Sequence, residues 1–465
     1  MKRILAFFGT SIVLAAQLLL IAPVHAATAV SITSPTSGST ETGTSFTVTG
    51  TATADRKITV EVDGDEVGTT TSDGSGDWTL EVTGQDAGAK TITATASVEY
   101  AYVLNSDAAT MSVINTATDE VVNTVTTTTN QIGNITISPD GTQAVSTSGF
   151  GGDGSIRVYS LADPEAPVIT NNITAADSYS MSAFYSPDGT YFYVNSVQND
   201  VSSSTVTRYT AASPGTTAAV TGYDQSFPGA IAFNSSGSTM YVSNIISGSV
   251  SVVNTATNTQ TSVIDTGAAT HVGAIFMVDD NKMFLLSNNL DVAFPVTDLT
   301  GTPTVGADIT LGDGPQGGVF NEDKSRLVVA NGTDNTLSVI NTATNAVVDT
   351  ISTGASTTPI NLIYTNDFSK LYLTQNGTDN VGLLNPTSFA SVSSPITVGE
   401  GPRGIAIGPS ESETTTVDFT LASTAASSSS DLLADTGKNT YVYFAVASAL
   451  LIMPTLYIRK RLFDR

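Results

Sequence analysis

The sequence has 465 residues and a formal net charge of -25, because 42 Asp and Glu residues outnumber 17 Lys and Arg residues. Such a negative surface repels phosphate backbones and anionic lipids, so nucleic acid is not an expected partner. The absence of cysteine excludes disulfides, thiolate metal sites, a cysteine nucleophile and a lipidated N-terminal cysteine. A chain of this length predicts about two or three modules.

The N-terminus has the three parts of a secretory signal peptide. Basic residues precede an apolar run over residues 4–21, and Val24-His25-Ala26 fits a small-residue cleavage site. We therefore expect a signal peptide at residues 1–26, with an uncleaved membrane anchor as the alternative. Either segment carries the bulk of the chain across a membrane, so we expect an extracellular protein.

Residues 27–97 contain short runs in which apolar and polar residues alternate, separated by Gly, Asp and Ser turns. This period of two predicts a small antiparallel β-sandwich. The order of the segments, with ITSPTSGS first, VDG in the middle and GDW before the last strands, resembles bacterial Ig-like domains. Trp78, the only tryptophan, is expected in the core rather than against a ligand.

Strand-like phrases recur through residues 98–410, namely AYVLN, AVSTS, FYVNS, MYVSN, MFLLS, LVVAN and LYLTQ. They begin about 43 to 48 residues apart, a spacing typical of propeller blades. A second strand-like segment follows each phrase, and the best copies add a third, as in SVINTATNAVVDTI at 338–351 and SVINTATDEVVNTV at 112–125. A fourth apolar phrase precedes a turn such as SPDG. Each period therefore predicts one four-stranded blade.

Seven such periods predict an all-β chain with a seven-bladed β-propeller over residues 98–410. The last apolar segment, GIAIGP at 404–409, has no partner strands after it, so we expect it to pair with AYVLN at 101–105 and close the ring. The YVLN, YVNS and YVSN strands followed by SVINTATN resemble the YVTN family of β-propeller repeats. The resemblance implies a bacterial or archaeal surface protein, and it defines the architecture better than the function.

The C-terminal part predicts attachment to a cell wall. Residues 411–432 contain few large apolar residues and are expected to form a flexible stalk. The motif LADTG follows, and after it come an apolar run over 441–458 and a basic tail. The residues of the motif are Leu433, Ala434, Asp435, Thr436 and Gly437.

This arrangement resembles a cell-wall sorting signal of the LPXTG type, with Ala434 in place of proline as in the LAXTG variant. The resemblance implies that a sortase cleaves between Thr436 and Gly437 and joins Thr436 to a cell-wall amine. The apolar run and basic tail hold the end of the chain in the membrane before cleavage. A permanent single-pass anchor at 441–458 is the alternative.

No catalytic constellation is visible in the sequence, and no metal or cofactor is expected. After removal of the signal peptide, His271 is the only histidine, which excludes a His-based metal cluster or a His-assisted serine triad within one chain. The leading interpretation is a surface protein that binds an unknown glycan or protein ligand. The alternatives are an extracellular propeller enzyme, lactonase- or lyase-like and metal-dependent, and a structural component of the wall or surface layer.

The connections between strands differ between the two faces of the predicted propeller. The first and third connections of each blade are short and alike, such as SPDG and NTATN, and we call their side the uniform face. The others differ from blade to blade, as in GFGGDGS, NIISGSV and LGDGPQGG, and we call their side the variable face. Loops on a rigid scaffold suit recognition, although drift of unconstrained loops explains the same variation. The candidate ligand contacts at or near its channel mouth are Tyr179, Tyr223, Phe227, His271, Gln316 and Arg403.

Overall fold

The computed structural model describes residues 30–127, 133–149, 152–175, 179–198, 204–223, 227–267, 271–408 and 410–423. These residues form almost only strands, with one short 3-10 helix, η1 (Asn376–Thr378). Within these ranges no helix has the length and apolarity needed to cross a membrane. The predicted signal peptide (1–26), sorting motif (433–437) and apolar segment (441–458) lie outside the described residues.

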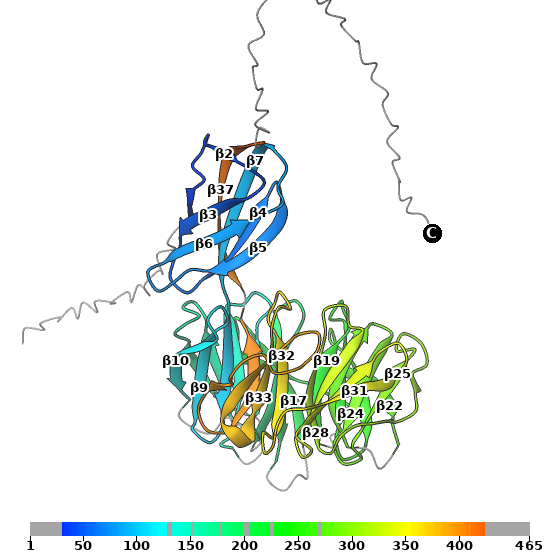
Figure 1. The fold of residues 1–465 in the computed structure, drawn as a ribbon. Coiled ribbons are helices and arrows are strands. Elements are labelled where there is room, and N and C mark those ends of the chain that lie inside the picture. The colour runs from blue at the N-terminus through cyan, green and yellow to red at the C-terminus, as the bar shows by residue number, and fades with distance from the viewer. Residues whose placement is uncertain are drawn as a thin grey trace, which may run out of the picture. The chain divides into compact units, whose positions relative to one another are not determined.

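The Ig-like domain is a sandwich of two sheets (Figure 1). The first sheet consists of β1 (Ser31–Ser34), β3 (Phe46–Thr51) and β6 (Asp77–Val82). The second consists of β2 (Thr40–Thr42), β37 (Glu411–Ala422), β7 (Gly88–Val98), β4 (Lys57–Val62) and β5 (Asp65–Thr71). Alternate residues of β4 are buried, which is the period-2 pattern of a strand with one face in the core. Trp78 lies in this core, as predicted.

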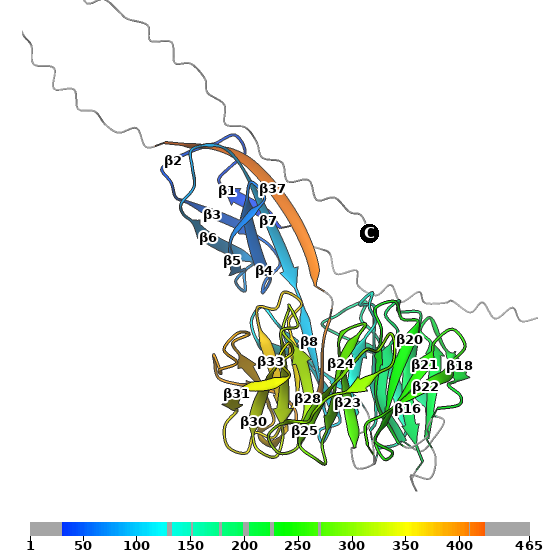
Figure 2. The ribbon, with the colours of Figure 1, turned by 90° about the vertical axis from the view of Figure 1, so that its right-hand side faces the viewer.

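The second sheet takes one strand from beyond the propeller. β37 pairs antiparallel with β7, from Glu411 opposite Val98 to Leu421 opposite Gly88, and its end pairs parallel with β2 (Figure 2). The prediction of a flexible stalk at 411–432 is therefore wrong for residues 411–422, and residues 424–432 lie outside the described ranges. The propeller is thus an insertion between two neighbouring strands of the Ig-like domain.

The side chains of β37 explain why this segment is ordered. Phe419 and Leu421, two residues apart, are only 3% and 1% exposed and belong to the core of the sandwich. Phe419 packs edge-on against Phe46, with ring centroids 4.9 Å apart. Burying an aromatic side chain contributes roughly 2 kcal/mol, which favours the paired strand over a free chain.

The propeller consists of seven sheets, counted over the described residues. The first comprises β36 (Pro402–Ile407), β8 (Tyr100–Asn105), β9 (Thr110–Asn115) and β10 (Glu120–Thr126). The second and third comprise β11 (Ile135–Ile137), β12 (Gln143–Thr147), β13 (Ser155–Ser160) and β14 (Val168–Thr174), then β15 (Tyr179–Tyr185), β16 (Tyr191–Val197), β17 (Ser204–Thr210) and β18 (Ser213–Ala219).

The remaining sheets follow in the same order along the chain. The fourth and fifth comprise β19 (Pro228–Phe233), β20 (Thr239–Asn244), β21 (Ser249–Asn254) and β22 (Thr259–Asp265), then β23 (Val272–Asp279), β24 (Lys282–Ser287), β25 (Val292–Thr297), β26 (Thr304–Val305) and β27 (Ile309–Thr310). The sixth and seventh comprise β28 (Pro315–Phe320), β29 (Arg326–Asn331), β30 (Thr336–Asn341) and β31 (Ala346–Ser352), then β32 (Pro359–Tyr364), β33 (Leu371–Gln375), β34 (Asn380–Leu384) and β35 (Ile396–Thr397).

The innermost strands close a ring. Successive contacts join β36 to β11, β11 to β15, and so on through β19, β23, β28 and β32 back to β36. β36 pairs antiparallel with β8, with Ile405 opposite Val103 and Ile407 opposite Ala101. The predicted pairing of the last strand with the first is therefore confirmed, as is an all-β chain with an Ig-like domain and a propeller.

Burial explains the sequence of each repeat. The AYVLN-type strand lies second from the axis between neighbouring sheets, and every residue of β8 is buried. The outermost strands alternate between partly buried and exposed positions, as in β31. Apolar side chains are therefore required on both faces of the second strand, whereas one face of the outer strand contacts water.

Side-chain hydrogen bonds explain the repeated turns. In the SPDG turn at residues 138–141, the Asp140 carboxylate accepts hydrogen bonds from the Ser138 hydroxyl (2.6 Å) and the Thr142 N–H (3.1 Å). These bonds lower the pKa of Asp140. In NTATN, the Asn341 side-chain oxygen accepts the N–H groups of Ala343 and Thr344 at 3.0 and 2.9 Å. Each turn is thus held by hydrogen bonds to the side chain of one of its own Asp or Asn residues, which favours repeated use of the same letters.

Candidate functional site

The variable face contains most of the predicted contact residues. Tyr179 begins β15, while Gln316 and Arg403 are the second residues of β28 and β36. Phe227 and His271 directly precede β19 and β23. All five positions therefore lie at the same end of innermost strands, which the fold gathers around the propeller axis.

These side chains differ in exposure. His271 and Gln316 are exposed, whereas Tyr179, Phe227 and Arg403 are partly buried. The N–H of His271 donates to the Asn289 side-chain oxygen at 2.8 Å, and the carbonyl of Phe227 accepts the N–H of Ile245 at 2.9 Å. The backbone of both linking segments is thus tied to a neighbouring loop.

Tyr223 requires a correction. Its side chain is 5% exposed and belongs to a core cluster with Val206 and Tyr193. Its hydroxyl donates to the Ser204 carbonyl at 2.9 Å. Tyr223 lies in the predicted connection between two sheets, but its aromatic ring points inward and packs between those sheets. Tyr223 is therefore a packing residue and not an exposed contact.

A second candidate site is a cleft that the sequence did not indicate. It has a volume of about 650 Å³ and lies where the Ig-like domain meets the uniform face. Hydroxyl groups of Thr59, Thr71 and Ser97 line one wall, and the loop from Thr365 to Lys370 lines the other. Its residues come from distant parts of the chain, so no local motif announces it.

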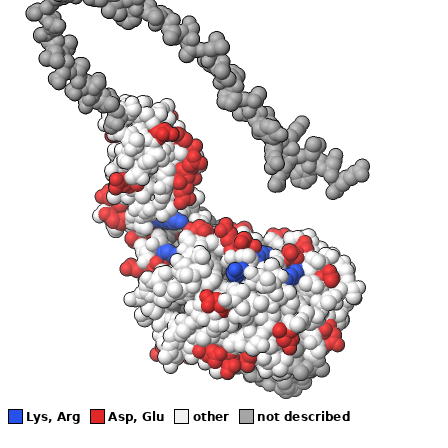
Figure 3. All heavy atoms as spheres, turned by 45° about the vertical axis from the view of Figure 1, so that its right-hand side comes forward, with Lys and Arg blue, Asp and Glu red and all other residues white. Residues whose placement is uncertain are grey.

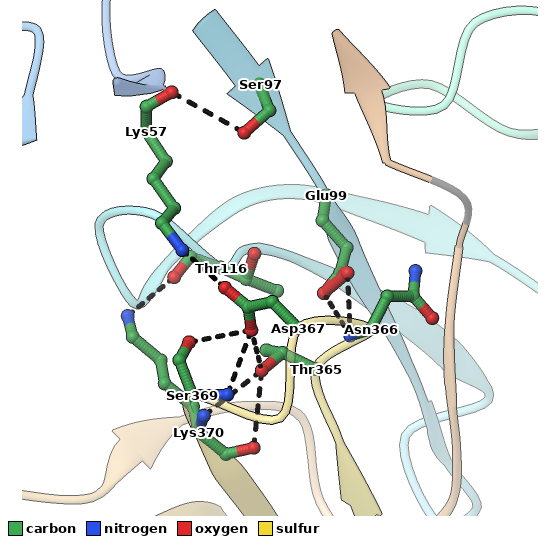
Figure 4. A network of polar contacts seen from close by, with 9 residues as sticks. All are labelled: Lys57, Ser97, Glu99, Thr116, Thr365, Asn366, Asp367, Ser369 and Lys370. Carbon is green, nitrogen blue, oxygen red and sulfur yellow. Dashed lines mark hydrogen bonds and ion pairs between the residues drawn. The ribbon is translucent and has the colours of Figure 1, made fainter. Parts of the chain in front are cut away.

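Charged side chains cross this junction (Figure 4). The Lys57 ammonium group of β4 forms an ion pair with the Asp367 carboxylate of the propeller. Burial opposes ionisation of Asp367, but hydrogen bonds from Lys57, Ser369 and Thr365 together lower its pKa below the usual range. A further hydrogen bond joins the Asn115 side-chain nitrogen of the propeller to the Asp55 carbonyl at 3.0 Å. Polar contacts as well as covalent links therefore hold the two domains.

A second ion pair stabilises the propeller side of the cleft. Lys370 contacts the Asp119 carboxylate at 2.8 Å and donates to the Thr116 carbonyl at 2.6 Å. The Tyr372 hydroxyl donates to the same carboxylate at 2.5 Å. Burial, together with the charge of Asp119, raises the pKa of Tyr372, so its hydroxyl keeps its proton and remains a donor. These bonds join the first and last sheets of the ring.

Glu99, between β7 and β8, is the buried carboxyl group at this junction. Its side chain is 7% exposed and accepts the backbone N–H of Asn366. Burial raises its pKa from 4.5 to about 7, and the neighbouring Asp367 carboxylate adds to the rise. The cleft thus contains a carboxyl group that titrates near neutral pH beside an ion pair. In the described part of the chain, no three His, Asp or Glu side chains gather closely enough to hold a metal ion.

Figure 3 shows Lys and Arg side chains at the end of the propeller that joins the Ig-like domain, with Asp and Glu side chains spread over both domains. Lys282, Lys324 and Arg326 accompany Lys370 on the uniform face, because they lie in or next to the first connection of their sheets. Arg403, by contrast, lies on the variable face. The basic groups are therefore divided unequally between the two faces.

Residues 29–94 match the family model for the bacterial Ig domain. The matched range ends before β37, so the model does not include the strand that the structure adds after the propeller. No curated protein matches the chain.

Several solved structures share the propeller fold. The Pseudomonas aeruginosa periplasmic gluconolactonase PpgL aligns with a TM-score of 0.57 and 16% identity, over 67% of this chain and 99% of that one. A Bacteroides fragilis protein described as a 6-phosphogluconolactonase gives 0.56 and 11%, over 67% and 98%. A protein of unknown function from Desulfotomaculum acetoxidans gives 0.53 and 17%, over 66% and 98%. The comparisons therefore show a bacterial Ig domain at residues 29–94 and, at this low identity, the fold of lactonase-type β-propellers.

Proposed function

We propose that the chain is a cell-surface binding protein, in which the Ig-like domain holds the propeller by its uniform face and the variable face binds a ligand. The observation that carries this proposal is the insertion of the propeller between β7 and β37. Two covalent connections leave the same end of the propeller, because β8 begins there and β36 ends there.

The contacts at the junction support the same arrangement. The ion pair between Lys57 and Asp367 and the hydrogen bond between Asn115 and Asp55 both involve loops of the uniform face. The variable face lies at the other end of every strand, so the Ig-like domain leaves it accessible. A rigid scaffold with accessible loops of differing sequence suits recognition of a glycan or protein.

The proposed attachment follows from the direction of β37. This strand begins next to the propeller and ends paired with β2, so the described chain leaves the Ig-like domain at the end away from β8. The LADTG motif at 433–437 follows shortly afterwards. We propose that a sortase is a transient partner at this motif and that it joins Thr436 to a cell-wall amine. The alternative is a permanent membrane anchor at 441–458. Both place the propeller outside the cell.

A binding screen of the full-length chain against glycans and surface proteins tests the proposal. The double variant His271→Ala/Gln316→Ala changes exposed side chains on the variable face, and Glu322→Ala changes an exposed side chain on the uniform face as a control. We expect the first variant to lose at least about tenfold in affinity for any captured ligand, and the control to lose none. Equal effects of the two variants contradict the assignment of the binding face.

The structural neighbours favour a second candidate function, an extracellular lactonase. Two of them are named for gluconolactonase activity, although their identity to this chain is only 16% and 11%. Incubation of the full-length chain with glucono-δ-lactone and with 6-phosphogluconolactone, with and without divalent metal ions, tests this function. Hydrolysis faster than the buffer rate supports an enzyme, and hydrolysis at the buffer rate under all conditions contradicts it for these substrates.

A further inference from the structure

We propose that Arg403 recognises an anionic group, a carboxylate or phosphate on a small organic ligand, at the axis of the variable face. This inference rests on the proposed function, because it names the ligand chemistry for the same face. It depends on three observations: the position of Arg403 in a ring of equivalent residues, its lack of a partner, and the arrangement of the nearby carboxylates.

Arg403 occupies a position that occurs once in each sheet. It lies two positions before Ile405, which pairs with Val103 of β8, and the equivalent residue of each other sheet lies two positions before the residue at that same pairing position. The equivalent residues are Gly133, Met181, Gly229, Gly273, Gln316 and Ile360. Each of the seven is partly or fully exposed. Every position of the ring therefore keeps some contact with solvent.

The ring contains one cation and no anion. Three of the equivalent residues are glycines. A Cβ at Gly273 would meet nothing within 4 Å, whereas a Cβ at Gly133 would lie 2.0 Å from Thr147 Oγ1 and one at Gly229 would lie 3.0 Å from the Ile245 side chain. The six positions equivalent to Arg403 therefore carry only small or uncharged groups. Within the ring, Gln316 is the other side chain that can donate hydrogen bonds, so a ligand held by Arg403 finds a second polar contact there.

Arg403 also differs from every other basic side chain that the structure describes in the propeller. The others donate hydrogen bonds to protein oxygens, and they are Arg157, Arg208, Lys282, Lys324, Arg326 and Lys370. The Nε atom of Arg403 is buried and has no hydrogen-bond partner, and no described residue forms an ion pair with its guanidinium group. Removing part of a charged group from water without compensation costs free energy, and an anion bound to the rest of the guanidinium group offsets this cost because the positive charge is delocalised.

Three carboxylates lie at the loop that precedes Arg403, those of Asp107, Asp379 and Glu400, and none of them forms an ion pair with it. Asp379 Oδ1 accepts the N–H of Gly401 at 2.9 Å and so holds the loop between the seventh and first sheets. Glu400 is exposed in the same loop and forms no ion pair with Arg403. Their negative charges repel anions in the surrounding solution. An anion therefore binds here only if it contacts the guanidinium group directly.

Guanidinium geometry indicates the ligand class. The planar fork binds the two oxygens of a carboxylate or phosphate in parallel, and such charge-assisted bonds are stronger than neutral ones. The probes are gluconate for the carboxylate source, inorganic phosphate for the phosphate source, and 6-phosphogluconate for both. Sorbitol, a neutral polyol, controls for contacts that do not involve the charge.

Isothermal titration calorimetry of the full-length chain at low salt measures the effect. We expect at least one anionic probe, but not sorbitol, to bind the wild type. Arg403→Gln should weaken that binding by about 10- to 100-fold, and Arg403→Lys by a smaller factor because the ammonium group keeps the charge but loses the fork. Arg326→Gln is the matched control, because it removes the same charge from the uniform face. Glu400→Gln should strengthen binding, since it removes a nearby negative charge.

The outcomes are distinct. The inference is overturned if no anionic probe binds the wild type, if Arg403→Gln binds as well as the wild type, or if Arg326→Gln loses as much affinity as Arg403→Gln. Unchanged melting of both Arg403→Gln and Arg403→Lys separates lost recognition from lost folding. If glycans or proteins still bind the variable face while every small anion fails, the proposed function survives and only the role of Arg403 is wrong.

Discussion

The buried Glu99 carboxyl group accepts the backbone N–H of Asn366, with N–O distances of 3.3 and 3.0 Å. Burial raises the pKa of Glu99 from 4.5 to about 7, so the folded chain binds this proton more tightly than the unfolded chain. The stabilisation is complete below pH 4.5 and is lost as the pH rises through about 7. On this basis ionisation of Glu99 lowers the free energy of unfolding by on the order of 3 kcal/mol above neutral pH.

We therefore expect Glu99→Gln to raise the melting temperature at about pH 8 and to change it little at about pH 4, because the amide keeps the acceptor without the charge. Thermal unfolding across this pH range checks the result. Glu120→Gln, at an exposed position of β10, is the control and should show no such dependence on pH. A variant at Glu99 that follows the wild-type pH profile would contradict the role of burial.

The second prediction concerns the strand that follows the propeller. Phe419→Ala removes a ring that is 3% exposed and packs against Phe46, so it should destabilise the Ig-like domain by about 3 to 5 kcal/mol. Hydrogen exchange should increase in β7 and β4 but not in the propeller sheets. Val417→Ala, at a partly exposed position of the same strand, should cost less. Equal exchange in the wild type and Phe419→Ala would argue against the structural role of β37.

The third prediction compares two truncations. A chain that stops after residue 410 keeps β36 and loses only β37, so its propeller should retain a cooperative melting transition. A chain that stops after residue 401 also loses β36, which leaves β8 with an unpaired edge and the ring open. We expect this shorter chain to aggregate or melt at least about 10 °C lower, since a domain of this size loses several kcal/mol. Identical melting of the two propellers would contradict closure through β36.

The fourth prediction concerns the LADTG motif. If a sortase cleaves there, Thr436 becomes the last residue of the mature chain and is joined to the wall, while the segment from Gly437 onward is left behind. Thr436→Ala should leave the protein extractable by detergent with its surface display retained. Mass spectrometry of wall-digested material decides the matter: a wild-type peptide that continues through Gly437 into the apolar run indicates a permanent anchor instead.

Local patterns were sufficient for the repeating parts of the fold. The recurring AYVLN-type phrases predicted the second strand of each sheet because those residues are buried on both faces. The unpartnered segment at 404–409 predicted closure because an innermost strand without following partners has to pair elsewhere. Both arguments depend on spacing and on which positions are apolar, and both are visible within one period of the sequence.

The rest depends on contacts between distant residues. Alternation of Val417, Phe419 and Leu421 was present in the sequence and is typical of a strand with one buried face, but the surrounding Ser and Thr residues favoured a linker. Its partner, β7, lies more than 300 residues earlier, as the separation of 327 between Thr91 and Asp418 illustrates. The inward turn of Tyr223 and the meeting of Lys57, Glu99 and Asp367 likewise follow only from three-dimensional packing.

The insertion of the propeller has a mechanical consequence. If the chain is held beyond residue 423, tension applied at the variable face passes along β37 directly into β36, and the other Ig strands lie outside the load path. β37 is already extended, so separating it from β7 adds little length. Force spectroscopy between the propeller and the C-terminal end should show no unfolding step of Ig-domain size. A large step would contradict this load path. If no such step occurs, the Ig-like domain stiffens the link formed by β37 but adds no length to it under tension.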